Sequence, residues 1–176
     1  MKRSYSRFLW LAVAFLLFKF WQHRLSIADL QFLLYPIKVA IEWVTGAKAE
    51  YLPKEGYFFC DLHCVIGESC SGLNFLFISW CTLSSLVLLY YPSRRNRGLA
   101  LVATAPASYF IALFANTARI LGAIVLLRLS VLFPWFRAPW LHQAEGILVY
   151  FSLLFLSCLA LYYWIQKNTQ KNEKPA

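Results

Sequence analysis

Long apolar runs constrain this chain more than any other feature. Apolar residues dominate 72–91, 98–129 and 146–165, and each run reaches the ~20 residues that a helix needs to cross a bilayer. A shorter run, 8–22, follows a basic start, and no small-residue cleavage site follows it, which favours an uncleaved first span. Hydrophobic residues make up 60% of the chain. The sequence therefore predicts an all-α polytopic membrane helix bundle that forms a single integral membrane domain over residues 1–176. About four transmembrane helices are expected, at approximately 8–22, 72–91, 98–118 continuing to about 129, and 146–165.

The region between the first two spans is more polar. Asp29, Lys38 and Glu42 interrupt the segment 25–44, so it cannot cross hydrocarbon cheaply. We expect it to lie along the membrane interface as an amphipathic helix that breaks near Pro36. Residues 47–69 have the composition of a loop, in which 57–59 forms a short strand or a segment that dips into the interface.

The net charge of +9 does not indicate a nucleic-acid partner, because the basic residues cluster at the flanks of the apolar runs. There they set topology or contact anionic lipid head groups, so membrane lipids are the expected partners and nucleic acid is not. With four spans, the N-terminus, the basic segment 94–97 and the C-terminal tail share one side, which the positive-inside rule makes cytoplasmic. The loop 23–71 and the turn 130–145 then lie outside.

Three reactive side chains are expected at that outer face. Cys70 comes just before one span, His142 just before the last, and Arg119 lies deep in the long apolar run. Arg119 follows Gly98 by 21 residues, or about 32 Å of helix at 1.5 Å per residue. The hydrocarbon core is about 30 Å thick, so Arg119 also arrives at the outer interface.

This set of residues predicts a cysteine-dependent site. Cys70 would act as a thiolate favoured by a helix N-terminus, with Ser69 or Ser71 capping the helix and Gly72 leaving room for a substrate backbone. His142 would take the thiol proton and later protonate a leaving amine. Arg119 would stabilise an oxyanion or clamp a substrate carbonyl. Asn116 lies three residues before Arg119 on the same helix face and would orient Arg119 or a substrate amide. The predicted site as a whole needs no metal and no cofactor.

Plainer interpretations exist for each residue and for the whole chain. Taken singly, Cys70 would be a structural cysteine, Arg119 a snorkelling arginine and His142 a solvated histidine. Cys60 and Cys64 leave three alternatives open, namely a disulfide, a zinc site with His63, or free thiols. Rival functions are a four-helix membrane thiol-disulfide oxidoreductase and a non-enzymatic membrane scaffold, although no Cys-x-x-Cys motif supports the former.

Three short motifs resemble those of the exosortase/archaeosortase family. They are Cys-Ser-Gly at 70–72, Asn-x-x-Arg at 116–119 and His-x-x-x-Gly at 142–146, in this order and in this membrane setting. The resemblance covers roughly 46–165. Because typical bacterial members are longer and have more spans, the chain resembles a compact subtype such as the one called exosortase K.

The resemblance implies an activity and a set of roles. Members are membrane-embedded cysteine proteases or transpeptidases that process exported proteins with a C-terminal sorting signal, which consists of a short motif, a transmembrane helix and a basic tail. Carried over by motif, Cys70 is the nucleophile, Arg119 the essential cation and His142 the acid/base. The implied location is the bacterial cytoplasmic (inner) membrane, with the active site facing the periplasm and both termini in the cytoplasm.

Overall fold

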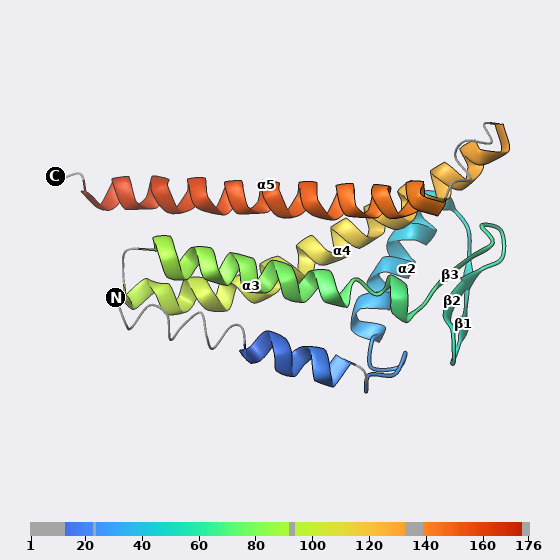
Figure 1. Ribbon diagram of the computed structural model, residues 1–176, viewed down its shortest axis with the longest axis horizontal. Helices are drawn as coiled ribbons and strands as arrows, with labels where there is room; N and C mark the ends of the chain where they lie inside the picture. Colours follow the sequence, from blue (N-terminus) through green and yellow to red (C-terminus); the bar gives the residue numbers. More distant parts are fainter. Residues whose placement is uncertain (1–12, 23, 92–93, 133–138, 174–176) are drawn as a thin grey trace. The chain divides into compact units, whose positions relative to one another are not determined.

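The computed structural model describes residues 13–22, 24–91, 94–132 and 139–173 (Figure 1). After a helical stretch at 13–22, the elements follow one another in a simple order. They are α2 (Gln31–Thr45), β1 (Ala49–Leu52), β2 (Gly56–Phe59), β3 (Cys64–Ile66), the 3-10 helix η1 (Glu68–Cys70), α3 (Leu73–Tyr90), α4 (Arg94–Leu132) and α5 (Pro139–Glu173).

Three of the described helices are long and apolar enough to cross a membrane. They cover Glu68–Tyr90, Arg97–Ser130 and Gln143–Asn168, which correspond to the three long apolar runs of the sequence. The predicted all-α membrane class is therefore confirmed, with a small sheet added. The first predicted span, 8–22, lies partly outside the described residues, and its described part is the shorter apolar helix Val13–Gln22.

Two helix boundaries differ from the sequence prediction. The basic segment 94–97 was expected in a loop, but α4 already begins at Arg94. The turn expected at 130–145 is shorter, because α5 begins at Pro139, and a proline at the first helical position has a preset φ and no N–H to satisfy. His142 consequently lies inside the first turn of α5 rather than before the helix. Residues 133–138 of that turn are outside the described residues.

The chain divides into two compact units that share α4 and α5. Unit 1 comprises Met1–Arg24, Asn74–Ile111 and Leu154–Ala176. Unit 2 comprises Leu25–Leu73 and Ala112–Leu153.

Unit 1 is built from membrane-type helices with few polar contacts. The ring of Phe18 stacks on Phe77 with centroids 3.6 Å apart. Ser84 and Thr104 join α3 to α4 through a buried hydroxyl–hydroxyl hydrogen bond of 2.9 Å. Both hydroxyls thereby find a partner inside an apolar bundle, where an unpaired one would be costly.

Unit 2 contains α2 packed on the small sheet (Figure 1). Leu33, Leu34, Ile37 and Ile41 are fully buried along one face of α2, as the expected amphipathic helix requires. The predicted break near Pro36 is wrong, since α2 continues through that residue. An interior proline costs about 3 kcal/mol, whereas burying one leucine or isoleucine contributes about 1.5–3 kcal/mol, so burial on both sides of Pro36 outweighs the missing hydrogen bond.

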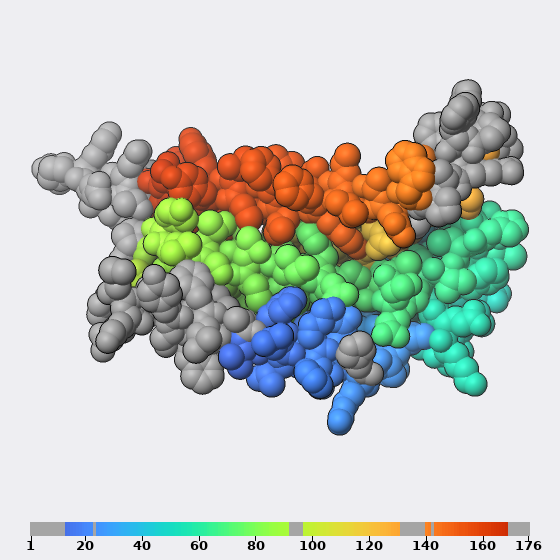
Figure 2. All heavy atoms as spheres, in the orientation of Figure 1, coloured from blue at the N-terminus to red at the C-terminus, as the bar shows by residue number. Residues whose placement is uncertain are grey.

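The sheet is antiparallel with the order β1-β2-β3. The strand predicted at 57–59 is confirmed as β2, while β1 and β3 were missed because their residues had the composition of a loop. Tyr57 pairs with Ile66 and Phe59 with Cys64, and Tyr57 also donates a 2.7 Å hydrogen bond from its hydroxyl to Gln31 Oε1 on α2. The strands, teal in Figure 2, reach the molecular surface. The chain leaves β3 towards Cys70, so the sheet anchors the segment that carries this cysteine.

Candidate active site

Cys70 ends the short helix η1, between β3 and α3. Its backbone N–H donates to the carbonyl oxygen of Gly67 over 3.0 Å, which closes the 3-10 turn. The thiol is half-buried, and Ser69 Oγ lies 3.8 Å from Cys70 Sγ. The cysteine thus sits on an ordered turn just before a membrane helix, as the sequence predicted.

The two residues after Cys70 prepare the start of α3. Ser71 is buried, and its hydroxyl accepts the backbone N–H of Leu73 over 3.4 Å, which is the predicted capping role. Gly72 has φ +71, a left-handed conformation that costs little only for glycine. A Cβ at this position would also lie 3.0 Å from Asn116 Cγ. Gly72 therefore allows α4 to approach the cysteine turn closely.

Asn116 connects α4 directly to the cysteine. Its side chain is completely buried, and its Nδ2 donates to the carbonyl oxygen of Cys70. Its Oδ1 accepts a 2.7 Å hydrogen bond from the hydroxyl of Tyr150 on α5. Both ends of the amide are thus engaged, and the amide orientation is fixed by its partners.

Arg119 lies one helical turn after Asn116 and uses the same tyrosine. Its Nη1 donates to the Tyr150 hydroxyl over 3.2 Å, and its guanidinium carbon lies 5.5 Å from the Tyr150 ring centroid, within the range of a cation–π interaction. The guanidinium also interacts electrostatically with Cys70 and Glu145. Arg119 is therefore a half-buried cation held beside the cysteine, whereas a snorkelling arginine would extend to water.

Two further glycines make room for the charged residues of the site. A Cβ at Gly146 on α5 would lie 3.0 Å from Arg119 Nε, and a Cβ at Gly122 on α4 would lie 2.5 Å from Glu145 Oε1. Both carboxylate oxygens of Glu145 are buried. Each helix thus offers a glycine where the other helix places a charged side chain.

The structure describes the backbone of His142 but not its side chain. The residue lies in the first turn of α5, one turn before Gly146 and three residues before Glu145. Since α-helical residues three and four apart share a face, position 142 belongs to the face of α5 that carries Glu145 and Gly146.

The other cysteines are free thiols, as is Cys70. Cys60 is exposed and Cys64 half-buried, and no disulfide joins them. Burial raises the pKa of the Cys64 thiol, and the neighbouring Cys70 raises this pKa further, which places the two thiols within electrostatic reach. Among the described side chains, no group of three or more His, Cys, Asp and Glu residues is arranged to hold a metal ion.

The sequence prediction brought together most of this site but missed Tyr150. Cys70, Ser71, Gly72, Asn116 and Arg119 all belong to one connected arrangement. Tyr150 escaped notice because it lies inside an apolar run rich in aromatic residues. Its position, four residues after Gly146 and eight after His142, was the available signal, since this spacing puts it close to the motif face of α5.

No protein-family model matches the sequence, and neither a curated protein nor a solved structure gives a significant match.

Proposed function

We propose that this chain is a membrane-embedded cysteine peptidase or transpeptidase that cleaves C-terminal sorting signals of exported proteins. The observation that carries the proposal is the chain of contacts from Arg119 through Tyr150 and Asn116 to the backbone of Cys70. It joins two motifs that are 46 residues apart in sequence, and it holds a cation beside a cysteine. A structural cysteine and a snorkelling arginine need no such arrangement.

The reaction begins with the Cys70 thiolate, formed when His142 accepts the thiol proton. Sγ attacks the scissile carbonyl carbon, and the carbonyl π electrons move to oxygen, where the Arg119 guanidinium stabilises the negative charge. The oxyanion collapses, the C–N bond breaks, and the leaving amine takes the proton from His142. A thioester on Cys70 remains. Water or an acceptor amine then attacks this thioester, gives up a proton to His142, and releases the thiolate.

Asn116 and Tyr150 position these groups in the proposed reaction. Asn116 holds the backbone of Cys70, and Tyr150 fixes both the asparagine amide and one amino group of Arg119. The rest of the guanidinium fork is left to face the reacting carbonyl, which is the geometry that a planar, multidentate cation provides.

The proposed location is the outer face of the bacterial cytoplasmic membrane, with both termini in the cytoplasm. Support comes from the three apolar helices and from the basic residues that flank them. The proposed partners are exported proteins that carry a transmembrane helix followed by a basic tail. Such a helix would lie in the same bilayer as the enzyme and bring its outer end to the depth of Cys70.

The decisive experiment deletes the gene in its own cell and restores it with variants. Quantitative proteomics of membrane proteins should show that precursors with a C-terminal helix and a basic tail accumulate in the deletion strain. Wild type and Cys81→Ala should restore processing, because Cys81 lies in the interior of α3 and belongs to unit 1, whereas the site residues belong to unit 2. Cys70→Ala and Arg119→Lys should not restore it. Full processing by Cys70→Ala would end the proposal, and dependence on Cys64 as much as on Cys70 would favour thiol–disulfide exchange instead.

A further inference from the structure

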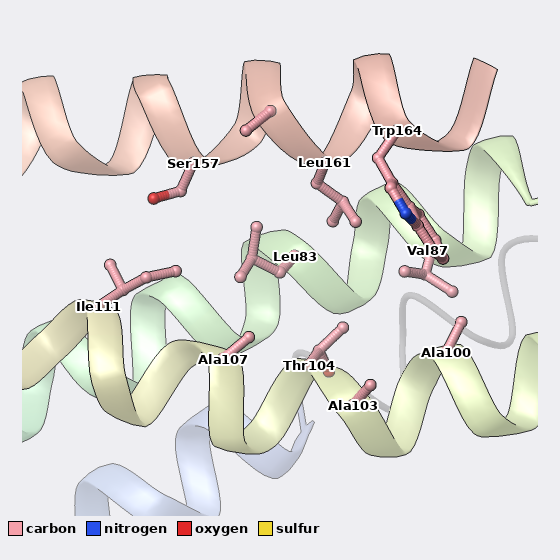
Figure 3. Close-up of a pocket in the computed structure, with 11 residues that line it drawn as sticks. Leu83, Val87, Ala100, Ala103, Thr104, Ala107, Ile111, Ser157, Leu161 and Trp164 are labelled. Atoms are coloured by element: carbon pink, nitrogen blue, oxygen red, sulfur yellow. The ribbon is translucent and has the colours of Figure 1, made fainter. Parts of the chain in front are cut away.

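A cavity in unit 1 opens between α3, α4 and α5 (Figure 3). Its volume is about 380 Å³, and all of its lining residues lie in the membrane-spanning parts of these helices. The lining consists of Leu83, Val87, Ala100, Ala103, Thr104, Ala107, Ile111, Ser157, Ala160, Leu161 and Trp164.

Small side chains on facing helices create this space. Ala100, Ala103, Thr104 and Ala107 occupy positions i, i+3, i+4 and i+7 on α4, so they form one face of that helix. Ala160 lies on the part of α5 that borders the cavity. Larger apolar side chains close the ends and the α3 wall, as Figure 3 shows. The result is an elongated apolar space along the helices.

The cavity offers little to a polar ligand. The hydroxyl of Thr104 donates to the carbonyl oxygen of Leu101 over 2.7 Å and makes the buried hydrogen bond to Ser84, so it is already engaged. A peptide backbone or a sugar placed here would leave polar groups unpaired, at a considerable cost. An apolar cavity of this kind also tends to stay free of water. A hydrocarbon ligand suits the lining.

The size of the cavity favours a single flexible chain. A volume of about 380 Å³ accommodates roughly a dozen methylene groups, if each methylene takes the same ~30 Å³ as a water molecule in the liquid. An α-helix with side chains is about 10 Å wide and rises 5.4 Å per turn. The cavity would therefore hold about one turn of a helix, far less than a transmembrane partner presents.

Two basic residues near one end of the cavity favour a lipid with an anionic head group. Arg97 lies three residues before Ala100, and Lys167 lies three residues after Trp164. Arg97 is held in place through two hydrogen bonds, of 3.2 and 2.6 Å, to the carbonyl oxygen of Tyr91. The segments of unit 1 contain one acidic residue, Glu173, in their entire sequence. This end of the unit is complementary to an anion at the membrane surface.

We propose that the unit 1 cavity binds one acyl chain of an anionic phospholipid, with the head-group phosphate between Arg97 and Lys167. The bound lipid differs from bulk lipid in two respects: its chain enters an open groove lined by three helices, and its phosphate meets two cations. Bound in this way, it fills a void that would otherwise leave the facing side chains without contacts.

The test uses the full chain reconstituted in phosphatidylcholine vesicles. The vesicles carry a trace of phosphatidylglycerol or phosphatidylcholine with a photoreactive diazirine on the acyl chain, and cross-linked residues are mapped by mass spectrometry. We expect phosphatidylglycerol to label the segments 100–107 and 157–164 about fivefold more than phosphatidylcholine, a difference of about 1 kcal/mol in affinity. Lys167→Gln should remove most of this preference.

A matched pair of variants separates the cavity from the outer surface. Ala103→Phe fills the cavity, whereas Val102→Phe adds the same bulk to the neighbouring residue, which is 71% exposed and does not line the cavity. Labelling of 157–164 should fall severalfold in Ala103→Phe and stay unchanged in Val102→Phe. Equal labelling by both lipids, or labelling that Ala103→Phe leaves intact, would overturn the proposal. Displacement of the label by a co-purifying membrane protein would do so too, and would identify a helix as the occupant.

Discussion

The hydroxyl of Tyr150 offers the sharpest test of the site, because it joins Arg119 to Asn116. Tyr150→Phe keeps the aromatic ring beneath the guanidinium and removes only the oxygen. The completely buried Asn116 Oδ1 then loses its donor, and an unsatisfied buried acceptor costs about 1–3 kcal/mol. Arg119 loses a partner at the same time, so the guanidinium that we propose to act beside Cys70 is no longer fixed.

The consequence can be measured without knowing the substrate. A membrane-impermeant maleimide reacts with accessible thiols, and we expect Cys70 in Tyr150→Phe to react about tenfold more slowly at pH 7, corresponding to about 1.4 kcal/mol.

Tyr162→Phe is the matched control for this experiment. The Tyr162 hydroxyl also accepts a hydrogen bond, a 2.7 Å contact from Gln166 Nε2, but at an exposed position on α5. This variant should label like the wild type. If Tyr150→Phe also labels at the wild-type rate at pH 7, the contacts through Tyr150 do not govern the thiol, and the reasoning fails.

Three further predictions concern stability, measured by thermal unfolding in detergent. Gly122→Ala should lower the melting temperature by several degrees, because the new Cβ would lie 2.5 Å from a buried carboxylate oxygen; Gly98→Ala, whose Cβ meets nothing within 4 Å, should not lower it. Gly72→Ala and Gly46→Ala both place alanine at positive φ, +71 and +74, which lowers the free energy of unfolding by about 1 kcal/mol. Only Gly72→Ala also crowds a buried side chain, so it should lower the melting temperature more. Equal losses in the two variants would contradict the packing argument. Glu42 accepts hydrogen bonds, most strongly from the lysine four residues before it, and these lower its pKa below the usual 4.5. Its stabilising contribution is therefore present above pH 4.5 and lost as the pH falls through the lowered pKa, so Glu42→Gln should be less sensitive to acid than the wild type.

The sequence was most informative where a pattern extended over many residues. The three long helices followed from apolar runs, since only a helix satisfies its own backbone inside a bilayer. Asn116 and Arg119 were recognisable because polar groups in an apolar run are costly and need a function or a partner, and Cys70 because it comes just before an apolar run. Their partner Tyr150 was hidden, because tyrosine is common near membrane interfaces and carries no such signal.

The sheet and α2 show the opposite limit. Strands of three and four residues, such as β3 and β1, give almost no periodic pattern. They are stabilised by pairing with β2, which packs on α2, rather than by local preference. The continuation of α2 through Pro36 likewise depends on burial of Leu33, Leu34, Ile37 and Ile41, a tertiary effect that a local rule cannot anticipate.

The exchange of side chains between α4 and α5 has a mechanical consequence. Gly146 of α5 accommodates Arg119 of α4, and Gly122 of α4 accommodates Glu145 of α5. Sliding one helix along the other by a single residue, about 1.5 Å, would push each charged side chain out of its notch and against a neighbour that has a Cβ. These two contacts, made by side chains of opposite charge, favour one register of the two helices. We therefore expect any opening of this part of unit 2 to proceed by tilting or rotation of whole helices rather than by translation.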